Sequence, residues 1–460
     1  MLTSVARKTS LTAYGLALIA VLQGLSSSCV QAQGLDLEQA PILYTESKPD
    51  NPLTRLQDEL DRGTKTLKYD PQVSYLPSLL EALGVPVDSQ TLVFSKTSLQ
   101  RQRISPRSPR AIYFNDEVYV GYCRMGEVLE LSVADPKLGT VFYTMDQAEV
   151  EKPSILRQGD SCLICHGSSM NHGYPGHLVR SVFPDAGGNP ILSVGTARVD
   201  HTTPFVNRWG GWYATGQSGQ QVHRGNQTWS AAIRQPPEDL EPGRNIEDLS
   251  ERFPTRAYLS PHSDLVALLV FEHQSEGHNR IVRANFETRM ATHQQADFDR
   301  ILVRHTDGLS DSTRSRIKAA CEPLVKYLFF SKEAPLAEPV SGSSTFAKTF
   351  AARGPFDQQG RSLRQFDLQT RLFRYPLSYL IYNESIKTLP VEAKDYLRTR
   401  FTEILSGHDQ TPEFAHLTPP LRQEILEIVQ QTYPDLYDAR LGEQLRQATE
   451  QPVNTAPQGK

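Results

Sequence analysis

The sequence predicts an α+β protein in which an antiparallel β-rich half is followed by an all-helical C-terminal half. Two patterns predict this class. Between residues 111 and 145, short runs rich in Val, Tyr and Phe alternate with turn signals, as in 127-EVLELSV-133 and 140-TVFYTM-145. From about residue 262 onwards, apolar residues recur at helical spacing instead. A composition of 38% hydrophobic and 22% charged residues is that of an ordinary globular protein.

The first 32 residues have the features of an export signal peptide. Two basic residues precede the apolar run 11-LTAYGLALIAVLQGL-25, which is too short to span a bilayer comfortably. Cleavage after 30-VQA-32 predicts a secreted, periplasmic protein. The alternative is lipid attachment at Cys29, which would tether the protein to the outer side of a membrane. We favour simple secretion, because a serine stands where a lipidation motif usually has an aliphatic residue.

Residues 33–110 are expected to form an N-terminal segment of helices and loops. The runs 52-PLTRLQDELDRG-63 and 75-YLPSLLEALG-84 have helical spacing, and the second ends in a glycine suited to a C-cap. The basic, proline-punctuated run 99–111 predicts an exposed loop.

Residues 111–260 are expected to form the β-rich domain. The runs 111-AIYF-114 and 117-EVYVGYC-123 complete the predicted hairpins, with Asn-Asp as a tight turn between them. Further strands are expected in 190–199 and 211–216, each flanked by glycines.

Residues 261–440 are expected to form a helical domain. Ser263 and Asp264 can cap a helix that starts at residue 265. The run 333–344 has the composition of a linker, and residues 441–460 are predicted to be a disordered tail. The remaining predicted helices lie around 312–330, 376–388, 392–406 and 420–432.

A metal site in 272-EHQSEGHN-279 is not expected. His273 and His278 are five residues apart and diverge on a helix, whereas zinc-binding helices use a spacing of four. Gly277 is expected to end the helix. The sequence therefore predicts a polar helix end here.

The chemical motif of the chain is 159-GDSCLICHGSS-169. Covalent attachment of haem needs two thiols, which add to the two vinyl groups of the porphyrin, and an imidazole that reaches the iron from the same side. Cys162, Cys165 and His166 supply these groups on about one helical turn, and C-x-x-C-H is a haem-attachment signature. The export signal favours this interpretation, because c-type maturation takes place outside the bacterial cytoplasm.

Three other interpretations of the motif were weighed. A structural zinc site needs four ligands, and the sequence has no second C-x-x-C or H-x₃-H pair. A thioredoxin-like site should open a helix within a β-α-β unit, and the neighbouring sequence predicts hairpins. A disulfide between the two cysteines would leave His166 unexplained.

Residues 159–229 resemble the c-type cytochrome family, specifically its single-haem members. The resemblance implies one covalent haem c, bound through Cys162 and Cys165, with His166 as the proximal iron ligand, so that 111–260 is a β-rich c-type haem domain. The chain departs from small cytochromes c in two ways. Its motif lies in the middle of the chain, and no methionine follows Met170 until Met290. A cytochrome c fold and His/Met ligation are therefore not expected.

The distal side of the iron decides between electron transfer and ligand chemistry. Met170 and His172 follow His166 too closely to cross easily to the other face. His177 is the first candidate distal ligand, because flexible Gly-Pro-Gly chain precedes it. His223, in a glycine-rich loop, is the second candidate.

Other residues are candidates for the wall of a haem pocket. The tryptophans, Trp209, Trp212 and Trp229, fit either a porphyrin wall or an ordinary aromatic core. Cys123 and Cys321 are expected to be buried singly, as small hydrophobes. Arginines that can pair with haem propionates are Arg180, Arg198, Arg208 and Arg224.

The sequence thus predicts an exported single-haem c-type cytochrome that transfers electrons to or from a redox partner protein. A net charge of −4 gives no sign of nucleic-acid binding. A membrane partner is expected only if Cys29 is lipidated. The alternatives are a peroxidase-like haem enzyme with an open distal site and a haem-based sensor of small ligands.

Overall fold

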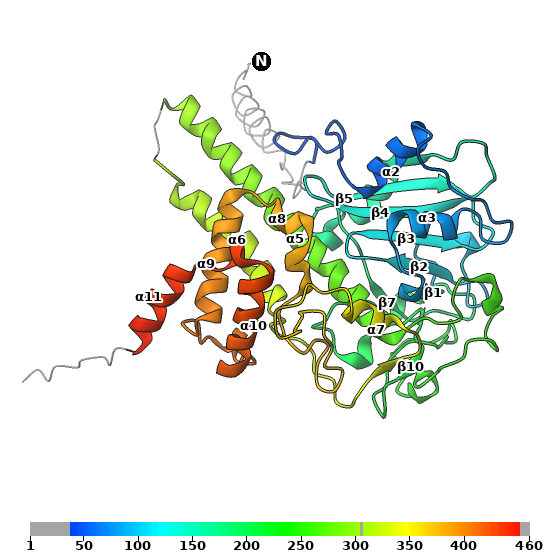
Figure 1. Ribbon diagram of the computed structural model, residues 1–460. Helices are drawn as coiled ribbons and strands as arrows, with labels where there is room; N and C mark the ends of the chain where they lie inside the picture. The colour runs from blue at the N-terminus through cyan, green and yellow to red at the C-terminus, as the bar shows by residue number, and fades with distance from the viewer. Residues whose placement is uncertain (1–36, 304–306, 451–460) are drawn as a thin grey trace, which may run out of the picture. The chain divides into compact units, whose positions relative to one another are not determined.

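The β-rich half is built on a seven-stranded antiparallel sheet with the strand order β6-β5-β4-β3-β2-β1-β9 (Figure 1). The computed structural model describes residues 37–303 and 307–450, and from Leu37 onwards these form one compact unit. The strands of the sheet are β1 (Thr91–Val93), β2 (Arg110–Phe114), β3 (Val118–Cys123), β4 (Val128–Asp135), β5 (Gly139–Asp146), β6 (Ile155–Gln158) and β9 (Trp212–Tyr213).

The hairpins predicted between residues 111 and 145 are confirmed as β2 to β5. Asn115 closes the first hairpin, because its side-chain oxygen accepts hydrogen bonds from the backbone N–H groups of Glu117 and Val118. Strand β1 was not predicted, since a run of three residues inside a polar segment carries no measurable alternation. It lies within the segment that was expected to be helices and loops.

Side chains that alternate along the strands cover both faces of the sheet. Tyr119 on β3 points towards the long helix α5 (Leu265–Ile301), where its hydroxyl meets His278 Nδ1 at 3.0 Å. Tyr122 on the same strand points the other way, towards the segment before α3 (Leu76–Leu83). Successive side chains of a strand point to opposite faces, so one face of the sheet is covered by α5 and the second face lies on the side of α3.

Helix α5 is one continuous helix where the sequence predicted a first helix from residue 265 and further amphipathic stretches through 280–293. Asp264 caps its first turn by accepting hydrogen bonds from Val266 N and Ala267 N, as expected. The helix then runs without a break through Gly277, so the prediction that Gly277 ends it is wrong. The glycine is needed for packing, because a Cβ at this position would overlap the side chain of Leu380.

Helices α6, α7 and α9 of the C-terminal half pack on α5, and α10 and α11 pack on α9. The predicted helix around 376–388 is two short pieces, a 3₁₀ helix over Tyr379–Tyr382 followed by α8. Residues 441–450 were predicted to be disordered but belong to helix α11. The helices besides α3 and α5 are α2 (Pro52–Asp61), α4 (Asp160–His166), α6 (Asp311–Leu328), α7 (Phe346–Ala351), α8 (Glu384–Lys387), α9 (Val391–Leu405), α10 (Pro419–Thr432) and α11 (Ala439–Glu450).

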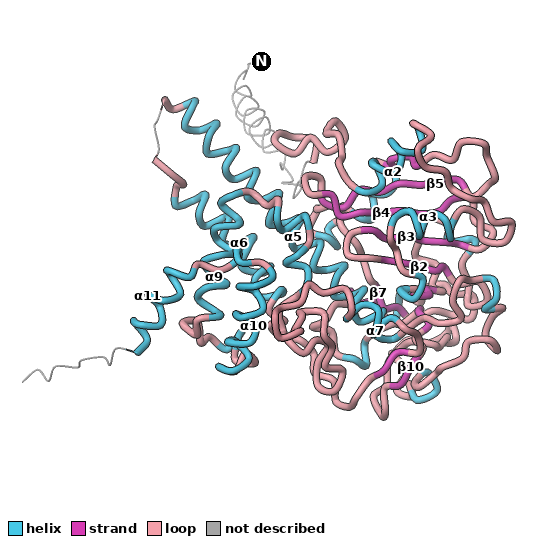
Figure 2. The backbone as a smooth tube through the Cα atoms, viewed as in Figure 1, coloured by secondary structure: helices cyan, strands magenta, loops and turns pink. Residues whose placement is uncertain are grey.

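One hydrophobic cluster joins the two halves. It includes Phe114 and Trp212 from the sheet, Phe271 from α5 and Phe401 from α9. Figure 2 shows that long loops surround the short strands of this part of the protein. These strands form two small antiparallel pairs, β7 (Arg180–Val182) with β8 (Thr196–Arg198) and β10 (Gly216–Gln217) with β11 (Ser341–Gly342). The α+β class is confirmed, with β11 as one strand in the otherwise helical half.

The predicted signal peptide and Cys29 lie outside the described residues. In the described part of the chain, from residue 37 on, no helix combines the length and the apolar character that crossing a membrane requires.

Candidate functional site

The C-x-x-C-H motif forms the helix α4, as its spacing predicted. Cys162 is half-buried and Cys165 is exposed, and both are free thiols. Burial raises the pKa of the Cys162 thiol. Ile164, between them, has 74% of its surface exposed. The motif therefore presents two thiols and an apolar side chain at the surface.

The ring of His166 is held by one hydrogen bond and one aromatic contact. Its Nδ1 lies 2.9 Å from the carbonyl oxygen of Gly176, so Nδ1–H donates and the lone pair is left on Nε2. The ring packs against Phe142 on β5, with 4.7 Å between centroids. Burial lowers the pKa of His166, which favours the neutral imidazole. A neutral ring with a free Nε2 and a bonded Nδ1–H is the form in which histidine ligates metals.

The segment that holds His166 is anchored to α5. Gly176 N–H donates back to the backbone oxygen of His166 at 3.0 Å, which closes the loop on the end of α4. Asn279 on α5 then bonds both backbone groups of His177, each at 2.8 Å. A Cβ at position 176 would overlap Asn279 Oδ1, so only glycine allows this approach. No local pattern predicted a role for Asn279, because it lies 113 residues beyond His166.

His177, the first candidate for the distal position, is buried next to His166 on the α5 face of the sheet. Its Nε2 bonds Ser132 Oγ at 2.9 Å, and its Nδ1 lies 3.5 Å from Thr140 Oγ1. Its ring packs on Tyr119 at 4.2 Å. Burial, His278 and His166 hold its pKa well below the ordinary value. Both of its ring nitrogens are thus engaged by the sheet.

His223, the second candidate, is buried in a different environment. Its ring contacts Trp209 and Phe205, with centroid distances of 5.0 and 5.9 Å, and its Nδ1 accepts the backbone N–H of Gly225. Burial lowers its pKa to about 4. The structure brings His177 near the motif, whereas it places His223 in this aromatic pocket.

The two residues set aside as too close to the motif are near it in the structure. His172 is exposed and adopts a left-handed conformation with φ of 57°. The backbone oxygen of Met170 is bonded by Arg198. Neither contact places Met170 or His172 on the opposite side of the His166 ring.

An ion pair that was not predicted from the sequence lies beside the motif. Arg110 on β2 and Glu130 on β4 lie 2.6 Å apart on the α5 face of the sheet and are mostly buried. Both act electrostatically on His166: Arg110 lowers its pKa and Glu130 raises it. Glu130 also raises the pKa of Cys162. The only sequence signal was a charge inside each of two otherwise apolar strands.

The tryptophans and arginines near the motif in sequence mostly serve the core. Trp209 and Trp212 belong to the hydrophobic cluster, and Trp229 packs on Phe183. The arginines named as propionate partners are engaged elsewhere: Arg180 with Thr196, Arg198 with Glu276, Arg208 with Glu272 and Arg224 with Asn207. Cys123 and Cys321 are buried and free, as predicted.

The run 272–279 is the polar middle of α5 and is almost wholly buried. Glu272 has no exposed surface, and it accepts hydrogen bonds from Arg208 and from Trp209 Nε1. Burial raises the pKa of Glu272 to about 8, against the attraction of Arg208. The prediction of a polar helix end is therefore wrong, since long-range partners from the loops satisfy these side chains inside the fold.

Two histidines face each other beside this carboxyl group. The Nδ1 atoms of His201 and His273 are 2.8 Å apart, and His273 Nε2 bonds Ser378 Oγ at 2.7 Å. Burial holds both pKa values well below the ordinary value, so both rings are neutral. Their rings stack with Tyr327 and Phe330. Within the described residues, no three His, Cys, Asp or Glu side chains are placed to hold a metal ion together.

The residues of α4 fit a covalent haem. Haem c needs two thiols for its vinyl groups and an imidazole for its iron. Helix α4 has two free thiols on one turn and an imidazole whose Nδ1–H is donated to a carbonyl. A haem iron takes four nitrogens from the porphyrin, so a single histidine suffices on the proximal side. No family model, curated protein or solved structure matches this chain.

Proposed function

We propose that this chain is an exported c-type cytochrome that binds one haem covalently and transfers electrons to or from a partner protein. The observation that carries the proposal is the state of His166, whose Nδ1–H is donated to Gly176 while Nε2 stays free next to two accessible thiols. The apolar run near the N-terminus supports export, which gives the chain access to c-type maturation.

Each residue of the motif has a defined part in this proposal. Cys162 and Cys165 hold the haem through thioether bonds, and His166 Nε2 is the proximal ligand. The bound haem supplies a one-electron couple whose potential depends on its axial ligands and surroundings. The hydrogen bond to Gly176 orients the His166 ring and raises its basicity, and the packing of Phe142 against the ring keeps water from that side.

A denaturing gel tests haem attachment directly. The wild-type chain, expressed with its own N-terminus in a host that matures c-type haem, should keep haem staining in SDS. The Cys162→Ala/Cys165→Ala variant should lose it. Cys123→Ala is the matched control, because Cys123 is a buried free thiol outside the motif. Equal staining of the wild type and the double variant would refute covalent attachment.

A second candidate function, a haem protein that binds a small ligand or reacts with peroxide, is favoured by one observation. Both ring nitrogens of His177 are hydrogen-bonded to the sheet, so ligation by His177 requires these bonds to break. Optical spectra in both redox states separate the two functions. Low-spin spectra without binding of carbon monoxide support electron transfer, whereas a high-spin ferric spectrum and fast reaction with peroxide support the open site.

A further inference from the structure

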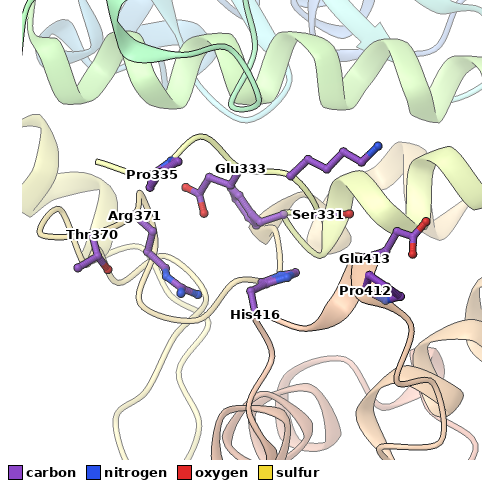
Figure 3. A pocket seen from close by; sticks show the side chains of 10 residues that line it. Ser331, Glu333, Pro335, Thr370, Arg371, Pro412, Glu413 and His416 are labelled. Carbon is purple, nitrogen blue, oxygen red and sulfur yellow. The ribbon is translucent and has the colours of Figure 1, made fainter. Parts of the chain in front are cut away.

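A cavity of about 560 Å³ lies in the helical half and includes no residue of the haem motif. The turn after α6 forms one wall with Phe330 and Ser331, and the loop at Thr370 and Arg371 forms another. The segment before α10 contributes His416 (Figure 3). A volume of this size is typical of sites for small organic molecules.

Two cations and two carboxyl groups line this cavity: Arg371, Lys332, Glu333 and Glu413. Arg371 points towards His416 in Figure 3, and among residues 37–303 and 307–450 neither Arg371 nor Lys332 forms an ion pair within 4 Å. Burial raises the pKa of Glu333 to about 7, so below that pH its carboxyl group is mostly neutral. Glu413 is already neutralised by Lys326, at 3.0 Å. The cavity therefore attracts an anion.

Two polar side chains in the wall each have an atom without a hydrogen-bond partner in the described part of the chain, and a ligand can supply that partner. Ser331 is 94% buried, and its Oγ has no hydrogen-bond partner among the described residues. His416 Nε2–H donates to the backbone oxygen of Phe329 at 2.7 Å, which leaves Nδ1 as an acceptor. Buried hydroxyl groups are rarely left without a partner, so the Ser331 hydroxyl is available to a group or a water molecule that enters the cavity.

The ring of Phe330 and two prolines, Pro335 and Pro412, give the cavity an apolar part. A second cavity of about 640 Å³ adjoins it and shares Ser331 and Lys332. The adjoining space brings in Lys318, a cation with no ion pair to any residue in the described part of the chain. Charge and apolar surface thus occur together on both sides of Ser331.

We propose that this cavity binds a small organic carboxylate with an apolar body, held by Arg371 and Ser331. Arg371 forms the charge-assisted hydrogen bonds to the carboxylate, and Ser331 donates its hydroxyl to the same group. The apolar body lies on Phe330 and the prolines. This site is independent of the haem proposal, because it shares no residue with α4 or with the loop that holds His166.

Calorimetric titration of the full chain with 2-naphthoate tests the site, and uncharged 2-naphthamide is the matched probe. We expect saturable binding of the carboxylate, with a dissociation constant at least about tenfold lower than that of the amide, because only the carboxylate pairs with Arg371. Absence of saturable binding of 2-naphthoate at millimolar concentration, or equal binding of the two probes, overturns the proposal.

Variants locate the binding. Arg371→Gln should weaken binding of 2-naphthoate by about tenfold or more, whereas Arg374→Gln, three residues along on an exposed position, should leave it unchanged. Ser331→Ala should weaken binding by a few-fold without loss of thermal stability, which covers the case in which the Arg371 variant is poorly folded. If Arg371→Gln and Ser331→Ala both bind as tightly as Arg374→Gln, the site is wrong.

The pH dependence gives an independent readout. Burial raises the pKa of Glu333, which lines the cavity, to about 7. Arg371, Arg208 and Asp367 act on it electrostatically, Lys332 adjoins it in the chain, and His416 is neutral because burial lowers its pKa. Binding of 2-naphthoate should weaken as the pH rises from about 6 to 8, because ionised Glu333 repels the ligand. Glu333→Gln should abolish this trend, and an unchanged trend in that variant contradicts the assignment.

Discussion

The helix α4 and the middle of α5 both gather side chains that bind metals or carry protons, but they differ in exposure. On α4, Cys165 is exposed and His166 keeps a free Nε2. On α5, Glu272 and His273 have no exposed surface, and each is bonded by partners from distant loops. Residue type alone therefore does not distinguish a reactive site from a buried polar core. The two kinds of site differ in whether the polar side-chain atoms already have hydrogen-bond partners within the fold.

The two regions are connected by Asn279. It lies on α5, seven residues after Glu272, and its side chain bonds both backbone groups of His177. The carbonyl that orients His166 belongs to Gly176, the preceding residue. The buried polar helix is therefore the support on which the exposed motif is positioned.

The largest expected effect follows from removal of a buried partner on α5. Arg208→Ala should lower the free energy of unfolding by about 3–5 kcal/mol, because it removes the cation paired with buried Glu272 and the side-chain donor to the backbone oxygen of Thr203. Urea denaturation measures this change. Arg314→Ala breaks an exposed ion pair with Asp311 and should cost less than about 1 kcal/mol. Similar costs for the two variants would remove the contrast between buried and exposed charge.

Acid should weaken the α5 region through its neutral histidines. Burial lowers the pKa of His278 from 6.5 to about 4, so the unfolded chain binds the proton first as the pH falls. Stability is fully present above about pH 6.5 and is lost as the pH falls through 4. His278→Gln should make this loss smaller by about 1–3 kcal/mol, as measured by urea denaturation at several pH values.

The matched control for this titration is His408→Gln, because His408 is exposed. That variant should follow the wild-type pH profile. If His278→Gln also follows the wild-type profile, His278 is not one of the groups that take up protons on unfolding.

The connection between the regions can be broken at Asn279. Asn279→Ala should cost about 1–3 kcal/mol, because the backbone N–H and C=O of buried His177 lose their partners. It should also shift the reduction potential and spectrum of the proposed haem, since the carbonyl that orients His166 is released. Asn285→Ala is the control: Asn285 is also buried on α5 but bonds Pro136. Equal spectral shifts in the two variants would mean that Asn279 does not position His166.

The smallest effect is expected on the exposed side of α4. Ile164→Ser should change the free energy of unfolding by less than about 0.5 kcal/mol, because 74% of the Ile164 surface is already exposed. Leu268→Ser on α5 removes a side chain that is 1% exposed and should cost more than about 2 kcal/mol. Denaturation of both variants compares the two helices directly, and a large loss in Ile164→Ser would show that α4 is packed more tightly than its exposure indicates.

Much of the fold was predictable from local patterns. The hairpins β2 to β5 follow from alternation and turn residues, and the start of α5 follows from Asp264 as its cap. The end of α5 did not follow, because Gly277 is a helix breaker by propensity alone. Its close packing against Leu380 overrides that propensity, and a contact across 103 residues leaves no local pattern in the sequence.

The candidate site, like the fold, was predictable only where its residues form a local pattern in the sequence. Cys162, Cys165 and His166 were found from their spacing, since the chemistry of haem attachment needs them on one helical turn. Gly176, Arg110 and Asn279 were not found. Each reaches the motif only through tertiary contacts, which spacing along the chain does not encode.

Local patterns in the chain are enough to predict the α+β class and a motif whose thiols and imidazole are adjacent in the chain. The free nitrogen of His166, the hydrogen-bonded ring atoms of His177 and the burial of the polar run of α5 depend on the three-dimensional packing. The physical reason is that hydrogen bonding and desolvation depend on neighbours in space. Those neighbours come from strands, loops and a helix that lie up to 113 residues from His166 in the chain.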